Sequence, residues 1–239
     1  MDPRKPFAWR RFADGSWKEE SGSVPAETRV AIELNDEPAG TIWASPHEPD
    51  RLALGHLLLE GWSFDAPKAR AELLESDGGV VARVHAPGAV PPREAPLPPA
   101  AFVPPYAPAS VVACVAGMQR EAKIYSEGGG VHAAALFWAG NLRYLAEDVG
   151  KLNTLARLAA AKALDGRTRR ALLLCCTGRV TGAMARRAAL LHAPVVVTLS
   201  SPTAEGVSVC RAAGITLAGY ARGKGFNVYV GDRIAPVSG

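Results

Sequence analysis

The second half of the chain alternates short apolar runs with segments of helical period, and this alternation constrains the fold more than any other feature. The runs 171–176 and 195–199 are apolar almost throughout, and a helical pattern follows each of them. Parallel strands need a long crossover, usually a helix, whereas antiparallel strands need only a short turn. Strands that are apolar on both faces lie between two layers of helices. The pattern therefore predicts an α/β fold, with a mostly parallel sheet and helices on its faces.

Ten elements are expected between residues 110 and 230, in the order α-β-β-α-β-α-β-α-β-β. The expected helices cover 110–126, 151–164, 180–192 and 203–213. The expected strands cover 131–138, 142–147, 171–176, 195–199, 215–220 and 227–230. Ala139-Gly140-Asn141 separates the first two strands and favours a tight hairpin turn.

The first third of the chain follows a different pattern. Residues 1–26 are polar and show no period, whereas 29–33 and 40–44 are expected to pair as a β-hairpin. Ser45 is the expected N-cap of the next helix, with Glu48 at the capping-box position. This part of the chain is expected to form a small α+β unit.

A proline-rich stretch separates these two parts. Nine of the chain's 19 prolines lie between Pro87 and Pro108. Proline fixes φ and lacks an N–H donor, so this stretch is neither helix nor sheet interior. We therefore expect an N-terminal α+β domain over 1–86, a linker over 87–108 and the α/β domain over 109–239.

The composition indicates the cellular compartment and excludes some classes of protein. No uncharged apolar run approaches the roughly 20 residues that span a bilayer, and the first residues contain no apolar stretch typical of a secretory signal. The four cysteines lie in apolar surroundings without a CxxC pair, which is typical of buried thiols in a reducing compartment. These features predict a cytoplasmic protein with no membrane partner.

Candidate ligand-binding residues follow the expected strands, because ligands of parallel α/β sheets bind at the carboxyl ends of strands. The candidates are Thr177, Gly178 and Arg179 after the first apolar run, Ser201 and Thr203 after the second, and Tyr220, Arg222, Lys224 and Asn227 near the end. Nine basic residues and one acidic residue lie between Arg167 and Lys224. Hydroxyl groups, arginines and a helix N-terminus suit a phosphate group. Helix capping and a solvated basic surface are the structural alternatives.

Two further segments join this candidate site. Gly129 and Gly130 precede an expected strand, where glycine permits positive φ and close approach of a ligand. His132 is the second residue of that expected strand. It is either a hydrogen-bonded structural residue or a residue that contacts the ligand. Glu147 and Asp148 precede an expected helix, where carboxylates can satisfy its first N–H groups or accept from a base or ribose.

Several blocks, in order, resemble the FdhD/NarQ family, the formate dehydrogenase accessory sulfurtransferases. They lie at 34–38 (LNDEP), 52–61 (LALGHLLLEG), 129–134 (GGVHAA), 147–153 (EDVGKLN), 177–179 (TGR), 201–203 (SPT) and within 214–229. The resemblance covers roughly residues 29 to 233.

The resemblance implies a cytidine-deaminase-like core, which is a mixed sheet with helices on both faces. It implies that the deaminase zinc site is missing, hence no metal site, and that the protein is a homodimer. It also implies binding of a bis-molybdopterin guanine dinucleotide cofactor, with molybdenum or tungsten, and sulfur delivery from a cysteine desulfurase to a formate dehydrogenase. A guanine nucleotide would mimic part of that cofactor. An RNA-binding protein on a deaminase-like fold is an alternative of another class, which the absence of HxE and PCxxC motifs disfavours.

The chain departs from the family at its sulfur chemistry. The family's CGxCG loop would lie between Val84 and Ser110, and this interval contains no cysteine. Leu152 and Thr177 stand where the family usually has histidine and serine. Cys176, beside a helix N-terminus and an arginine, and Cys114 are the remaining candidates for a persulfide carrier. Two mechanisms stay open: a cofactor-binding protein without sulfur transfer, and a sulfurtransferase with a nonstandard cysteine.

Overall fold

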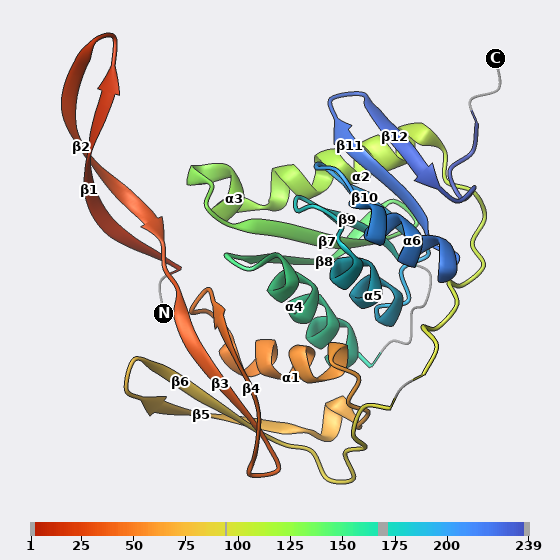
Figure 1. Cartoon of the computed structure of the whole chain (residues 1–239), viewed down its shortest axis with the longest axis horizontal. Coiled ribbons are helices and arrows are strands. Elements are labelled where there is room, and N and C mark those ends of the chain that lie inside the picture. The colour runs from red at the N-terminus through yellow and green to blue at the C-terminus, as the bar shows by residue number, and fades with distance from the viewer. Residues whose placement is uncertain (1–2, 94, 167–171, 237–239) are drawn as a thin grey trace.

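A computed structural model describes residues 3–93, 95–166 and 172–236. Its largest sheet has six strands in the order β12-β11-β10-β9-β7-β8 (Figure 1). These strands are β7 (His132–Trp138), β8 (Asn141–Asp148), β9 (Leu173–Cys176), β10 (Val195–Thr198), β11 (Thr216–Arg222) and β12 (Gly225–Val230). β9, β10 and β11 are parallel, whereas β7, β8 and β12 join by antiparallel pairing. The mixed α/β fold and the order of its strands are confirmed. The mostly parallel pairing expected from the alternation is wrong, because three of the five strand pairs are antiparallel.

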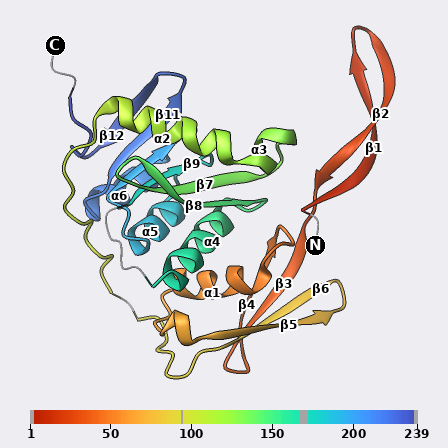
Figure 2. The ribbon, with the colours of Figure 1, turned by 180° about the vertical axis from the view of Figure 1, so that it is seen from behind.

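Helices cover both faces of this sheet (Figures 1 and 2). One face carries α2 (Pro108–Glu121), with α3 (Lys123–Gly128) after it, and the other carries α4 (Lys151–Leu164), α5 (Gly182–Leu190) and α6 (Ala204–Ala212). Successive residues of a strand point to opposite faces, so Cys175 packs on the α2 side and Cys176 on the α4 side. β9 and β10 are therefore apolar on both faces. The expected helix over 110–126 is divided at Ala122, which has a non-helical ψ of 84°.

The N-terminal part forms a four-stranded sheet in the order β4-β3-β6-β5. Its strands are β3 (Thr28–Leu34), β4 (Glu37–Ala44), β5 (Arg70–Ser76) and β6 (Gly79–His85), and its helix is α1 (Pro49–Leu59). α1 lies against α4, and a Cβ added to Gly55 would lie 1.8 Å from the carbonyl oxygen of Ala156. Leu57 and Leu155 belong to one hydrophobic cluster that joins this unit to the six-stranded sheet. The expected domain boundaries stay a prediction, with a shared core between the two units.

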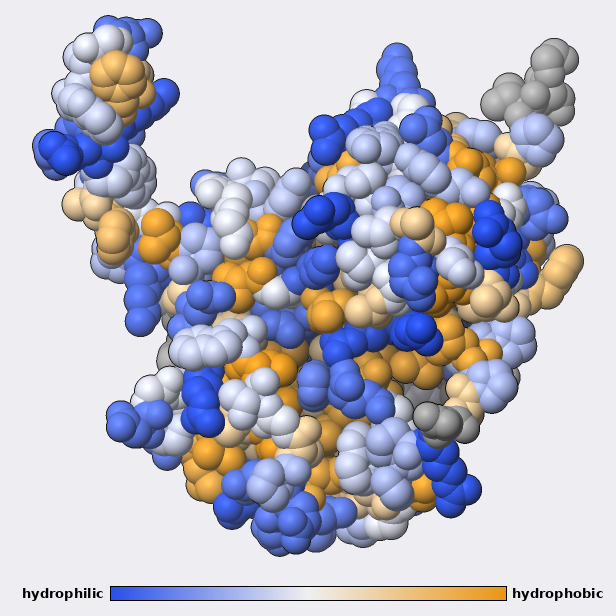
Figure 3. All heavy atoms as spheres, in the orientation of Figure 1, coloured by the Kyte–Doolittle hydropathy of each residue, from blue (hydrophilic) through white to orange (hydrophobic). Residues whose placement is uncertain are grey.

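One element near the N-terminus was not predicted, and one prediction there is wrong. Residues 4–25 form a regular hairpin of β1 (Arg4–Ala13) and β2 (Ser16–Pro25), although their sequence shows no period. Both strands are exposed on both faces, so burial imposes no alternation of apolar and polar residues. The turn is Asp14-Gly15, with φ of 53° and 75°, which is typical of a tight hairpin. The hairpin extends away from the body and displays hydrophobic side chains on its surface (Figures 1 and 3).

Ser45 is also not the N-cap of α1. The helix begins at Pro49, and its N-cap is Glu48 in a left-handed conformation with no side-chain capping bond. The Ser45 hydroxyl instead accepts from the backbone N–H of Val149, 104 positions further along. The residue thus fastens the N-terminal unit to the start of α4.

The proline-rich stretch runs along the surface between the two sheets (Figure 1). Backbone hydrogen bonds fix it at Val90 to Ser63, at Ala100 to Ala213 and at Tyr106 to Arg233. None of the described helices is long and apolar enough to cross a membrane.

Candidate functional site

The topology gathers most of the predicted site residues at one edge of the six-stranded sheet. β9, β10 and β11 are parallel, so their carboxyl ends share this edge. β7 runs antiparallel to β9, so His132 at its beginning lies at the same edge, and Asp148 at the end of β8 pairs with it. We call the set His132, Lys151, Thr177, Gly178, Ser200, Ser201 and Arg222 the strand-end edge.

Thr177 connects β9 to β7. Its Oγ1 accepts from the backbone N–H of Ala133 at 3.0 Å and lies 3.3 Å from Nδ1 of His132. Burial lowers the pKa of His132 below its ordinary value of 6.5, and the charge of Lys151 lowers it further. A neutral imidazole therefore faces this edge at pH 7.

The expected helix N-terminus at Thr177-Gly178-Arg179 is wrong. α5 begins at Gly182, and its N-cap is Thr181, which accepts from the N–H of Met184. Val180 instead forms a bridge to Pro202, so 177–180 is a connecting loop. Any anion at Thr177 would be held by side chains and loop N–H groups, because the helix dipole acts only near the helix's first turn.

Gly178 is packed between two side chains of the strand-end edge. A Cβ added there would lie 3.2 Å from Cβ of Lys151 and 3.4 Å from Nδ1 of His132. Its carbonyl accepts from the hydroxyl of Thr198 at 2.7 Å, which fixes the peptide against β10. Lys151 was missed from the sequence, although it follows Glu147 and Asp148 in the same block. Its position as the first residue of α4 was the available signal.

The ends of β10 and β11 supply the rest of the site. Nε of Arg222 donates to the carbonyl of Leu199 at 3.0 Å, so this side chain lies across the end of β10. The N–H of Tyr220 donates to the carbonyl of Ser200 at 2.8 Å, and the half-exposed Tyr220 has a positive φ of 51°. Thr203 is the N-cap of α6 and accepts from Gly206, which is the capping alternative.

The remaining cations and the last polar candidate are open to solvent. Arg179, Lys224 and Asn227 have exposed side chains, and Asn227 lies opposite Gly219 in the β11–β12 pair. Ser201 is half-buried, and its carbonyl accepts from the N–H of Val180. Arg167, Arg169 and Arg170, part of the basic excess, lie outside the described residues.

The two carboxylates have protein partners. Asp148 is fully buried and accepts from Arg157 at 2.7 Å and from Asn153 and Gly150 at 2.9 Å. Glu147 accepts from the N–H of Tyr125 near the start of α3 at 2.6 Å. These contacts give both residues a structural role, and a cofactor contact by either stays a prediction.

The glycine loop connects the strand-end edge to the N-terminal hairpin. Gly129 and Gly130 have φ of 63° and 76°. A Cβ on Gly130 would lie 2.7 Å from Cγ of Pro25, whereas one on Gly129 would meet no atom within 4 Å. The root of the hairpin therefore packs against this loop.

All four cysteines are buried. Burial raises the pKa of Cys114 to about 11, that of Cys176 to about 11 and that of Cys210 to about 12, and it raises that of Cys175 well above 9.0. The expectation that a helix dipole stabilises a Cys176 thiolate is wrong, because Thr181 caps that helix and burial dominates. None of these thiols is a ready nucleophile.

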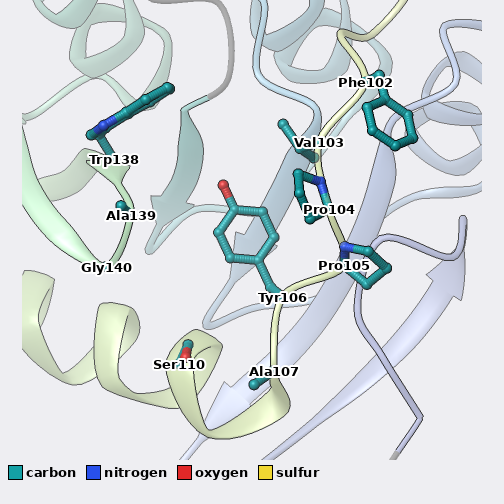
Figure 4. Close-up of a pocket in the computed structure, with 10 residues that line it drawn as sticks. All are labelled: Phe102, Val103, Pro104, Pro105, Tyr106, Ala107, Ser110, Trp138, Ala139 and Gly140. Carbon is teal, nitrogen blue, oxygen red and sulfur yellow. The ribbon is translucent and has the colours of Figure 1, made fainter.

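A separate hollow of about 520 Å³ lies at the β7–β8 turn, away from His132 (Figure 4). The Tyr106 and Trp138 rings face into it, and Phe102, Pro104 and Ser110 complete part of its lining. It contains none of the predicted site residues.

Comparisons with known proteins agree with the resemblance seen in the sequence. A family model described as the FdhD/NarQ family matches residues 91–235. A sulfur carrier protein FdhD of Thermoplasma volcanium is 36% identical over 114 residues, which cover 47% of this chain and 40% of that protein. One of Anaeromyxobacter sp. is 35% identical over 139 residues, which cover 54% and 48%. The chain thus aligns with less than half the length of these relatives.

A solved structure resembles this protein over nearly the whole length of both chains. It is described as that of a formate dehydrogenase accessory protein from Desulfotalea psychrophila. It has a TM-score of 0.82 and 25% identity, and the likeness covers 98% of this chain and 100% of that one. The hairpin, both sheets and the proline-rich stretch therefore fall within a shared architecture.

Proposed function

Because this chain belongs to the FdhD/NarQ family, we propose that it is an accessory protein that binds a molybdopterin guanine dinucleotide cofactor, as cargo, at the strand-end edge. Its client would be a formate dehydrogenase or a related molybdenum or tungsten enzyme. The known functions of similar proteins support this assignment, since they are described as a sulfur carrier and as a formate dehydrogenase accessory protein.

The observation that carries the proposal is the convergence, at one edge, of donors and cations from the ends of four strands and from the first residue of α4. Arg222 lies across the end of β10, and Lys151 lies beside Gly178. Hydroxyl groups of Thr177, Ser200 and Ser201 follow the ends of β9 and β10. Such a cofactor carries pyrophosphates, which charged hydrogen bonds from arginine and lysine bind well. The donor set therefore fits the group.

This chain's residues would hold the dinucleotide end of the cargo, whose metal would supply the redox chemistry in the client. Arg179, Arg222 and Lys224 would neutralise phosphates. Neutral His132, with Thr177, would offer a hydrogen bond without adding charge. The exposed ring of Tyr220 provides an apolar face on which a guanine could stack.

We further propose that the chain binds its cofactor without carrying a persulfide. Its Val84–Ser110 interval contains no cysteine, and the four thiols that it has are buried with raised pKa values. A sulfurtransferase needs an accessible thiolate that a cysteine desulfurase can reach. Transfer through Cys176 or Cys114 is the alternative, and it would require the sheet or α2 to open.

We also propose that the protein is a homodimer and that it is cytoplasmic. The family resemblance of the sequence supports the homodimer, and cysteines typical of a reducing compartment support the location.

Titration calorimetry with GDP and ADP tests the ligand. GDP should bind and ADP should bind more weakly. Arg179→Ala and Arg222→Ala should each weaken GDP binding by about 1.5–3 kcal/mol, because each removes a charged hydrogen bond to phosphate. Arg211→Ala, at the far end of α6, is the matched control and should bind like the parent. Equal binding or no binding of both nucleotides would refute the proposal.

A further inference from the structure

The β1–β2 hairpin, which we call the arm (residues 4–25), exposes an unusual amount of apolar surface. Five of the fifteen exposed large hydrophobic side chains in the described chain belong to it: Phe7, Trp9, Phe12, Trp17 and Val24. Phe7, Phe12 and Trp17 are each about 60% exposed. The arm extends beyond the body, with hydrophobic side chains visible on its surface (Figure 3).

Among the described residues, the root of the arm is bonded to and packed against the body. Ala26 donates to Pro3 at 2.8 Å, and Pro25 and Arg4 lie against the glycine loop. Further out, aromatic and charged side chains of the arm contact one another. The Phe12 and Trp17 rings lie 5.2 Å apart, and the Arg10 guanidinium lies 5.4 Å from the Trp17 ring. A lone two-stranded hairpin is at best marginally stable in water. The arm therefore needs a surface that covers it.

The N-terminal sheet of the same chain offers a matching surface. β5 and the turn after it carry three acidic residues and one basic residue, whereas residues 3–26 contain five basic and three acidic. β5 is an edge strand of that sheet. It exposes Leu73 and Leu74, by 46% and 39%, between Glu72 and Glu75. This edge is apolar and acidic, and the arm is apolar and basic.

These two surfaces cannot meet within one copy. The arm and the β5–β6 hairpin project on the same side of the molecule, from its opposite ends (Figures 1 and 2). A two-fold axis on that side would bring the arm of each copy to β5 of the other. Such an interface is closed and self-complementary.

We propose that the arm of one copy docks on the β5 edge of a second copy, and reciprocally. This inference names the surface of the homodimer proposed above. The arm has 22 residues, and a stable interface uses roughly 20–30 residues on each side. A second copy is always present to cover these aromatic side chains, whereas a transient partner would leave them in water between encounters.

Analytical ultracentrifugation of the full chain tests the proposal. The parent should have about twice the monomer mass of 25.1 kDa. The double variant Phe12→Ser/Trp17→Ser should raise the dissociation constant by at least about 30-fold, since two interface aromatics are lost. Phe102→Ser is the matched control: Phe102 is 89% exposed but lies in the proline-rich stretch, so the dimer should persist.

A charge reversal tests the receiving surface. The double variant Arg10→Glu/Arg11→Glu should weaken the dimer. When Glu75→Lys/Asp77→Lys is added to the same chain, the quadruple variant should regain at least a tenth of the lost affinity between copies. Near-UV circular dichroism checks that each variant is folded. A monomeric parent, or a dimer that resists both sets of arm variants, would overturn the proposal and leave the arm to another protein. GDP titration of the same samples reports on the proposed function separately.

Discussion

Arg157 and Asp148 form a buried ion pair, with Nη2 of the arginine 2.7 Å from Oδ2 of the aspartate. The same guanidinium donates to the carbonyls of Ser45 and His47. Asp148 also accepts from the N–H of Ser45. This ion pair therefore connects the segment between β4 and α1 to the strand-end edge. Asp148 lies opposite His132 in the β7–β8 strand pair.

Breaking this pair should destabilise the protein strongly. Arg157→Met leaves a buried carboxylate with fewer donors and two backbone carbonyls without partners. We expect a loss of about 3–5 kcal/mol in the free energy of unfolding, measured by urea denaturation. Arg51→Met removes an exposed pair with Glu48 at 2.8 Å and should cost less than about 1 kcal/mol. Similar losses in the two variants would contradict the assigned role.

Stability should rise with pH across the titration range of histidine. Burial lowers the pKa of His47, His56 and His132 below 6.5 in the folded protein. The unfolded chain therefore binds more protons as pH falls below 6.5, and stability is lost there. Urea denaturation between pH 5 and 8 should show a rise toward pH 7 and a plateau above it.

One histidine should account for part of this dependence of stability on pH. His56→Gln should flatten the rise, whereas His85→Gln, at an exposed position at the end of β6, should leave it unchanged. A pH profile that is flat in the parent would show that burial does not hold these imidazoles neutral.

The native thiols should resist modification. Incubation with a cysteine desulfurase and cysteine should give no persulfide adduct of about 32 Da by intact-protein mass spectrometry. Ser208→Cys, which places a thiol on the exposed face of α6, is a positive control for alkylation by iodoacetamide. A stoichiometric adduct that disappears in Cys176→Ser or Cys114→Ser would establish sulfur transfer and identify its carrier.

Close packing of α1 on α4 should make Gly55 irreplaceable. In Gly55→Ala the new methyl would overlap the carbonyl of Ala156, so the helices must separate. We expect a loss of about 2–3 kcal/mol in the free energy of unfolding. Gly117→Ala is the matched control in α2, because its Cβ would lie 3.5 Å from Phe137 and alanine favours helix by up to about 1 kcal/mol. Equal effects would refute the steric argument.

The sequence predicts the six-stranded sheet well because its strands are short, apolar and separated by helices. β9 and β10 are buried on both faces, and that burial leaves an unmistakable pattern. The arm leaves no such pattern, since neither of its faces is buried. Only Asp14-Gly15 indicated its turn.

The site could be predicted in part for a related reason. The order of the strands in the sheet brings His132, Thr177 and Arg222 to one edge. The alternation of strands and helices in the sequence is enough to predict that strand ends meet there. Details of helix ends are decided by tertiary contacts. The Ser45 hydroxyl accepts from the N–H of Val149 instead of capping α1, and Thr181, not Thr177, is the N-cap of α5. Lys151 was missed because its position at the start of α4 does not by itself show that Gly178 lies against it.

The contact between α1 and α4 also bears on how the chain is made. α1 ends at Leu59, and α4 begins at Lys151. At a synthesis rate of about 5–20 residues per second, α1 emerges roughly 5–20 seconds before its partner helix exists. During that interval Leu52 and Leu57, fully buried in the finished protein, lack part of their cover. During synthesis, the N-terminal unit therefore exposes apolar surface that the folded protein buries.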